Sequence, residues 1–188
     1  MDRHFIGKLF FTVLLVSYSQ FSCADLVATI AKIKPSIVAV GSHHPTGSPR
    51  SVFSGTGFAV GDGSVVVTNF HVVPSNLNAA KRERLVVFVG KGNKPKVYDA
   101  EVIASDRVHD LALLKIHGVK LAPLALGNDE DVKEGQAIAF TGYPIGAVLG
   151  LYAATHTGIV AAITPIAIPQ ISSTQLTPRM LKQLRKPY

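Results

Sequence analysis

Residues 64–73 read SVVVTNFHVV and decide the fold that we expect for this chain. The β-branched run from Val65 to Thr68 is typical of a strand, because such side chains fit a pleated, half-buried surface. The stretch predicts that this strand ends in a lone histidine, His71, at its edge. The backbone of His71 would then be fixed while its ring faces a cleft, which suits a general base.

A second stretch, residues 110–116 with the sequence DLALLKI, places a carboxylate at the start of another strand. A carboxylate beside an apolar run needs a hydrogen-bond partner, because burying it unpaired is costly. Asp110 could therefore hold the ring of His71 in one tautomer. Asp106 is a competitor for this role, but Asp110 directly abuts the apolar run and would be better fixed. For each side chain alone, a purely structural role stays open.

Short apolar segments recur along the chain at strand length, with glycine and proline turns between them. They cover residues 36–40, 52–60, 65–69, 85–89, 97–104, 111–116, 137–141, 149–155 and 157–163. Strands at this spacing predict an all-β barrel or sandwich. The last two segments are expected to form a strand pair. Residues 25–34 have apolar residues at helical spacing, so we expect a short helix that Pro35 ends, and residues 43–50 are expected to form a loop.

The first 24 residues have the pattern of a secretory signal peptide. Arg3 and Lys8 precede an apolar run over residues 9–16, and small residues at 22–24 suit cleavage after Ala24. The apolar run is too short for a good membrane span, so no stable membrane insertion is expected after cleavage. An uncleaved anchor and lipidation of Cys23 are the alternatives. Because Cys23 is the only cysteine, a bacterial exported protein, periplasmic or secreted, is favoured over a small disulfide-bonded domain.

The positive charge of the chain, formally +7 at pH 7, is concentrated near its C-terminus. Four basic residues with no acidic neighbour lie in a segment that is expected to form a surface helix: Arg179, Lys182, Arg185 and Lys186. No aromatic residues interleave with a basic groove, so binding to nucleic acid is not expected. The adjacent pair His43 and His44 and the acidic run 129–131 lack a supporting ligand set, and no metal site is expected.

The motifs at residues 68–73 (TNFHVV) and 110–115 (DLALLK) resemble the His and Asp motifs of trypsin-like serine peptidases of the HtrA/Deg type. Five flanking segments agree with that family in one consistent order. They are residues 54–58 (SGTGF), 123–127 (PLALG), 135–139 (GQAIA), 142–146 (GYPIG) and 157–160 (TGIV). Each motif is short, but together they extend the resemblance from about residue 33 to residue 164.

The resemblance implies a double β-barrel with the active site between the barrels. After the signal peptide (residues 1–24), the first barrel would span residues 25–126. A partial second barrel with the basic C-terminal helix would span residues 127–188. His71 would be the general base and Asp110 its orienting acid in the hydrolysis of polypeptide substrates through an acyl-enzyme, with no metal or cofactor. The resemblance carries no prediction about the oligomeric state.

The sequence departs from the family at the nucleophile. The family's serine lies in a Gly-Asn-Ser-Gly-Gly-like loop, but no Gly-x-Ser-Gly follows Asp110, and the only later serines, Ser172 and Ser173, lack flanking glycines. A tight turn that exposes a serine hydroxyl usually needs glycine. We therefore expect a truncated, inactive product whose serine is encoded beyond Tyr188. A pseudopeptidase or peptide-binding module of the same fold is the alternative, and an all-β domain in which His71 and Asp110 never meet is a third.

Overall fold

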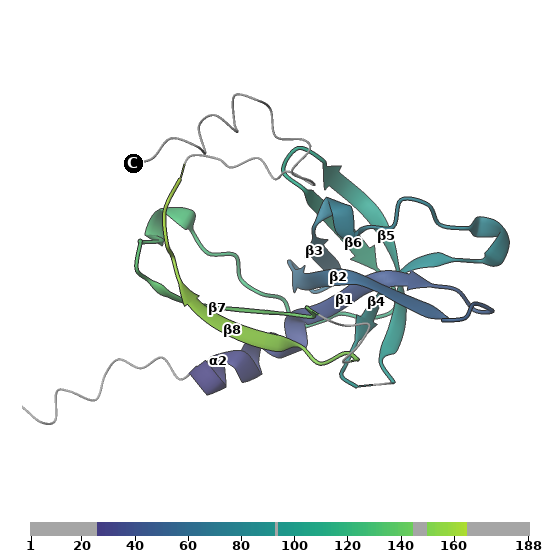
Figure 1. Ribbon diagram of the computed structural model, residues 1–188, viewed down its shortest axis with the longest axis horizontal. Helices are drawn as coiled ribbons and strands as arrows, with labels where there is room; N and C mark the ends of the chain where they lie inside the picture. Colours follow the sequence, from purple (N-terminus) through teal and green to yellow (C-terminus); the bar gives the residue numbers. More distant parts are fainter. Residues whose placement is uncertain (1–25, 93, 145–149, 165–188) are drawn as a thin grey trace, which may run out of the picture. The chain divides into compact units, whose positions relative to one another are not determined.

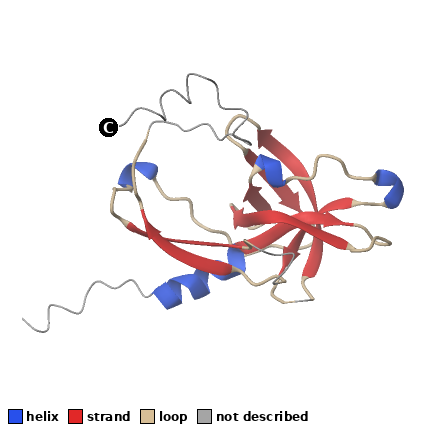
Figure 2. Ribbon diagram, in the orientation of Figure 1, coloured by secondary structure: helices blue, strands red, loops and turns tan. Residues whose placement is uncertain are grey.

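The computed structural model describes residues 26–92, 94–144 and 150–164. Six antiparallel strands close into a barrel in the order β1–β2–β3–β6–β5–β4, and β7 and β8 form a separate two-stranded sheet (Figure 1). The strands are β1 Ile37–His43, β2 Ser51–Val60, β3 Val65–Thr68, β4 Arg84–Val89, β5 Lys96–Asp106, β6 Leu111–Ile116, β7 Ala137–Gly142 and β8 Ala154–Ile159. Strands dominate the described residues (Figure 2). The all-β expectation, with one complete barrel and a second, incomplete sheet, is confirmed.

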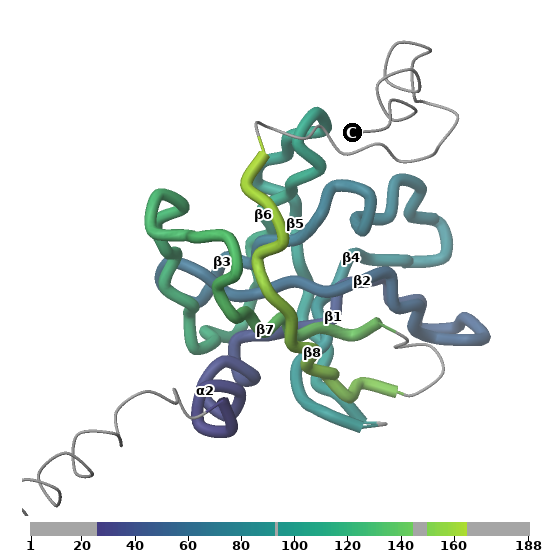
Figure 3. Tube along the Cα trace, turned by 60° about the vertical axis from the view of Figure 1, so that its left-hand side comes forward, coloured from purple at the N-terminus to yellow at the C-terminus, as the bar shows by residue number. Residues whose placement is uncertain are grey.

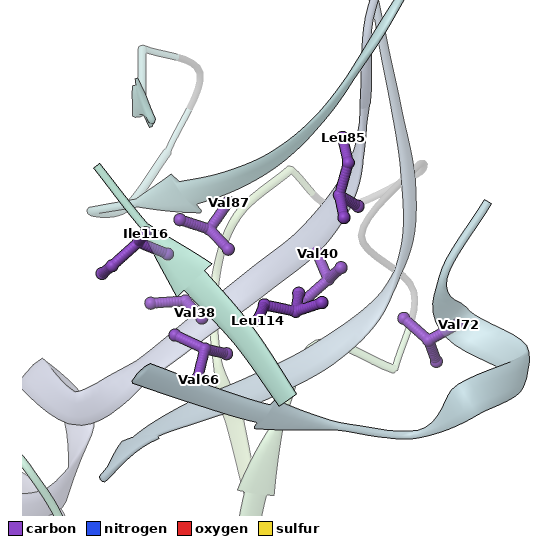
Figure 4. Close-up of a cluster of buried hydrophobic side chains, with 8 residues drawn as sticks. All are labelled: Val38, Val40, Val66, Val72, Leu85, Val87, Leu114 and Ile116. Carbon is purple, nitrogen blue, oxygen red and sulfur yellow. The ribbon is translucent and has the colours of Figure 1, made fainter. Parts of the chain in front are cut away.

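Alternate side chains of the barrel strands point inward and form the main core (Figure 4). Its buried members are mostly β-branched: Val38, Val40, Val66, Val72, Leu85, Val87, Leu114 and Ile116. Branched side chains are stiff and pack well on a pleated surface, which is why these short runs form strands. Val72 is the one member that lies outside the strands, in the turn after β3.

A second cluster covers the opposite face of β1 and β4. Ala39, Val86 and Phe88 pack with Leu151, which precedes β8 in the chain. Because β1 and β4 are covered on both faces, they read as continuous apolar runs instead of alternating ones. The backbone N–H of Tyr143, directly after β7, donates to Oγ1 of Thr56 on β2 at 2.8 Å. These contacts tie the two-stranded sheet to the outside of the barrel (Figure 3).

Glycine is required in the turn between β2 and β3. Gly63 has a φ of 84°, and a Cβ placed there would lie 2.0 Å from the carbonyl oxygen of Leu121. The N–H of Leu121 in turn donates to the carbonyl of Gly63 at 2.9 Å. The hairpin signal at residues 61–63 therefore serves two purposes, the reversal of the chain and the close approach of the segment that leaves the barrel.

The expected N-terminal helix is present as α2 (Leu26–Ile33), and Pro35 lies in the 3₁₀ turn Lys34–Ser36 that follows it. The helix falls almost entirely in the unit that ends at Lys32, while all strands belong to the unit that begins at Ile33. No helix among the described residues combines the length and apolar character needed to cross a membrane. The expected signal peptide and basic C-terminal helix lie outside the described residues, and the division into residues 1–24, 25–126 and 127–188 stays a prediction.

Three sequence-based expectations about strands were wrong. Residues 149–155 and 157–163 do not pair with each other; one strand, β8, crosses both segments and pairs with β7. A hairpin needs a loop of at least two residues, and only His156 separates the two segments. His43 belongs to β1, not to the loop that follows it. His71 does not end β3 but lies three residues beyond it, in the 3₁₀ turn Phe70–Val72.

Candidate functional site

His71 is held at the end of the barrel by its neighbour in the chain. The turn Phe70–Val72 follows β3, and Val72 is buried in the barrel core. Val72 lies over Gly55 of β2, where a Cβ would come within 2.5 Å of a Val72 methyl group. A glycine at position 55 therefore lets Val72 sink into the core, and the buried Val72 fixes the backbone of His71.

Asp110 occupies the last position of the turn between β5 and β6. It has a φ of 56°, a left-handed conformation that aspartate adopts more readily than most residues. Its carbonyl oxygen accepts hydrogen bonds from the N–H of Phe70 and from Nδ2 of Asn69, each at 3.1 Å. The main chain of Asp110 therefore joins the β5–β6 turn to the segment that carries His71.

The carboxylate of Asp110 contacts His71 at two points. Oδ1 accepts from the backbone N–H of His71 at 2.9 Å, and Oδ2 lies 2.6 Å from ring Nδ1. An ionised carboxylate can only accept, so Nδ1 carries the ring proton and Nε2 of the neutral ring keeps its lone pair. Nε2 has no hydrogen-bond partner in the part of the chain that the structure describes. The His71 side chain is 54% exposed and that of Asp110 only 11%, so the acid is enclosed and the base is accessible.

The pKa of Asp110 is set by opposing effects. Burial opposes ionisation, but hydrogen bonds from the backbone N–H and the ring of His71 outweigh it, and the pKa lies below its usual value. The carboxylate therefore stays ionised at neutral pH. An ionised partner can both fix the tautomer of the ring and stabilise the imidazolium that forms when the ring takes up a proton.

This lowered pKa predicts a pH dependence of stability. A depressed carboxyl pKa stabilises the fold above the unfolded-state value of about 3.9, and the contribution is lost as pH falls through the folded-state pKa. The difference in unfolding free energy between the unchanged chain and Asp110→Asn should therefore be largest near neutral pH and shrink below about pH 4. Urea denaturation of both proteins across this range measures it. A difference that does not change with pH would contradict the ionised state of Asp110.

Asp106, the competing acid, does not reach His71. Its Oδ2 lies 2.5 Å from ring Nδ1 of His109, and its Oδ1 accepts from the N–H groups of Val108 and His109. Of the two candidate acids, only Asp110 contacts the ring of His71 among the described residues, and its orienting role stays a prediction. The pairing of Asp106 with His109 was not predicted, although an aspartate three residues before a histidine at the end of a strand is a signal for such a turn.

The other candidates have local partners. His43 Nδ1 lies 3.1 Å from Oγ of Ser51, and ring Nδ1 of His44 accepts from the N–H of Thr46. The acidic run Asp129–Asp131 forms an exposed 3₁₀ turn that Asn128 caps. Among the described residues, no group of three or more His, Cys, Asp or Glu side chains could hold a metal ion. Ser172 and Ser173 lie outside the described residues.

Comparison with known proteins identifies the family to which this chain is similar. The family model described as "Trypsin-like peptidase domain" matches residues 55–181. Human serine protease HTRA3 is 33% identical over 150 residues, which is 78% of this chain and 32% of HTRA3. A probable periplasmic serine endoprotease DegP-like of Halomonas elongata is 33% identical over 109 residues, 58% of this chain and 20% of that protein.

The structural comparison agrees. The crystal structure of Deg5 superimposes with a TM-score of 0.57 at 25% sequence identity, covering 74% of this chain and 63% of that chain. The chain spans about a third or less of the length of the two relatives named above. The family match covers well over half of the chain and includes both His71 and Asp110. This protein therefore belongs to the trypsin-like serine peptidases of the HtrA type.

Proposed function

We propose that His71 is the general base of a serine-type endopeptidase and that Asp110 orients it. The observation that carries this proposal is the two-point contact of the Asp110 carboxylate with the backbone N–H and ring Nδ1 of His71. With its backbone N–H and its ring Nδ1 both bound to one carboxylate, the side chain of His71 cannot turn its ring freely. Its exposed Nε2 is left as the only ring atom able to accept a proton.

In the proposed reaction, Nε2 of His71 takes the proton of a serine hydroxyl while the serine oxygen attacks the carbonyl carbon of a peptide bond. The imidazolium then donates that proton to the leaving amine, and an acyl-enzyme remains. Water hydrolyses the acyl-enzyme with His71 again as the base. General base catalysis of this kind contributes about 10²–10⁴ in rate. The ionised Asp110 stabilises the imidazolium during both steps.

Polypeptides are the proposed substrates, because the relatives of this chain are named serine proteases. We also propose that the protein is exported. The signal-like residues 1–24 support this, as does the name of the Halomonas relative, a probable periplasmic protease. The sequence contains a base and an orienting acid, but after Asp110 it has no serine between glycines of the family type. The nucleophile is therefore proposed to come from residues outside this sequence.

The 188-residue chain is accordingly expected not to react with a fluorophosphonate probe, which labels activated serines. The measurement is in-gel fluorescence of the purified chain, with an active serine protease labelled in parallel as the positive control. Ser172→Ala and Ser173→Ala serve as matched variants. Labelling that disappears in either variant would identify a nucleophile inside the chain and overturn this part of the proposal.

The missing serine motif also favours a second candidate, a non-catalytic peptide-binding module of the same fold. The two candidates differ in the coding DNA downstream of the Tyr188 codon. A Gly-Asn-Ser-Gly-type motif there, in frame or just past a frameshift, supports the peptidase. Its complete absence supports the binding module, in which the contact between His71 and Asp110 would be a structural remnant.

A further inference from the structure

A second His–Asp pair lies immediately before Asp110, in the turn between β5 and β6. Asp106 is the last residue of β5 and pairs in register with Leu111, the first residue of β6. Its Oδ1 accepts from the N–H groups of Val108 at 2.9 Å and His109 at 3.1 Å. Its Oδ2 lies 2.5 Å from Nδ1 of His109. One carboxylate therefore binds three groups of the turn that leads to Asp110.

This pair contributes little to the stability of the whole fold. Both side chains are about half exposed, 48% for His109 and 47% for Asp106. Ion pairs with such exposure contribute little to stability, because water screens them. The hydrogen bond from the ring of His109 also lowers the pKa of Asp106, so the carboxylate is ionised and available to all three donors. The three hydrogen bonds instead fix the path of the main chain through residues 107–109.

That path determines where Asp110 points. Asp110 has a left-handed backbone conformation, which persists only when its surroundings hold it. On one side it is held by Asn69 and Phe70, which bind its carbonyl oxygen. On the other side it follows directly after His109. The same turn reaches the His71 segment a second time, because the guanidinium of Arg107 lies 5.5 Å from the centre of the Phe70 ring.

We propose that Asp106 is a positioning residue: through His109 and the turn it fixes, it keeps both carboxylate oxygens of Asp110 on His71. This inference rests on the proposed function, in which the contact between His71 and Asp110 orients the base. Among the described residues, Asp106 binds Val108 and His109 but not His71, and it acts only through Asp110. His109, which binds Asp106 through its ring and its backbone N–H, links Asp106 to Asp110.

The test compares two substitutions of Asp106 by NMR on the 188-residue chain. Asp106→Ala removes all three hydrogen bonds, whereas Asp106→Asn keeps an oxygen for the two backbone N–H groups and an amide for the ring of His109. The readouts are the downfield Nδ1 proton of His71 and the hydrogen exchange of the His71 amide, which donates to Asp110. We expect Asp106→Ala to speed this exchange about tenfold and broaden the ring proton, and Asp106→Asn to restore both.

A matched control is available on the same strand. Oε1 of Glu101 also lies near a histidine, 3.4 Å from Nε2 of His117, but within the described part of the chain its carboxylate accepts no backbone hydrogen bond. Glu101→Ala should leave the His71 signals unchanged, and thermal unfolding should show that all three variants stay folded.

The outcomes separate this inference from the function on which it rests. An Asp106→Ala variant whose His71 amide and ring signals match those of the unchanged chain would overturn the positioning role alone. Equal perturbation by Asp106→Ala and Glu101→Ala would also overturn it, because the effect would then not be specific to the turn. Absence of the Nδ1 proton of His71 from the unchanged chain would instead contradict the proposed function.

Discussion

Replacing Asp110 by asparagine is expected to move the ring proton of His71 from Nδ1 to Nε2. The carboxylate of Asp110 can only accept, and its Oδ2 lies 2.6 Å from Nδ1. An asparagine that keeps one oxygen on the backbone N–H of His71 must turn its NH₂ group toward the ring. Nδ1 then has to accept, and the neutral ring carries its proton on the wrong nitrogen. The variant keeps the shape of the site, but Nε2 of His71 can no longer accept a proton.

The measurement is the pair of ring ¹⁵N chemical shifts of His71 above its titration range, because these shifts distinguish the two tautomers. Asp99→Asn is the matched control, since the carboxylate of Asp99 also lies in an ion pair, 2.7 Å from Nη1 of Arg84, but Asp99 is on β5, two strands from β3 in the barrel order. The control should leave the tautomer unchanged. An Asp110→Asn variant that still carries the proton on Nδ1 would contradict the orienting role of Asp110.

The expected consequence for hydrolysis is large. In a protein that contains the serine, the wrong tautomer cannot accept the hydroxyl proton, and the corresponding change in other serine proteases lowers kcat by about 10⁴. The loss should fall on kcat more than on KM, because Asp110 is enclosed and is proposed to act only through His71. A change confined to KM would indicate that Asp110 contributes to substrate binding instead.

Replacing Leu114 by alanine is expected to cause a large loss of stability in the barrel. Leu114 is completely buried and packs among branched side chains of the strands around it. Truncation removes its buried methyl groups and leaves a cavity that stiff valine neighbours fill poorly. Such leucine-to-alanine changes cost about 2–5 kcal/mol. The measurement is the free energy of unfolding in urea.

Leu111→Ala provides the control on the same strand. Leu111 is 47% exposed, so its truncation removes little buried surface, and surface changes of this kind usually stay within about 0.5 kcal/mol. The loss in unfolding free energy should therefore be much larger for Leu114→Ala than for Leu111→Ala. Similar losses for the two variants would contradict the assignment of the inward and outward faces of β6.

The barrel could be predicted from the sequence where local chemistry and tertiary environment agree. The run from Val65 to Thr68 is β-branched and the segment Leu111–Ile116 is a short apolar run, so both strands were predicted at nearly their true bounds. The segment after residue 149 was misread because its pairing is not local. β8 pairs with β7 in a register that places Ala137 opposite Ile159. No short window of sequence contains both residues.

The contact between His71 and Asp110 was predictable to a similar degree. A lone histidine after one strand and a carboxylate before another pointed to His71 and Asp110, and the family motifs reinforced the pair. The geometry that makes them meet was not readable from the sequence. It depends on the left-handed backbone of Asp110 and on the burial of Val72 over Gly55, both of which follow from contacts between strands distant in sequence. The pairing of Asp106 with His109 was not predicted because it depends on the conformation of the turn between β5 and β6, in which Asp106 also accepts from two backbone N–H groups.

The most direct test of the central claim is the ¹⁵N spectrum of the His71 ring in the unchanged chain across its titration. We predict that the neutral ring carries its proton on Nδ1, bound to Asp110, and that Nε2 is the nitrogen that gains a proton as the pH is lowered. A neutral ring with its proton on Nε2, or one that exchanges freely between both tautomers, would contradict the claim that Asp110 prepares His71 as a base.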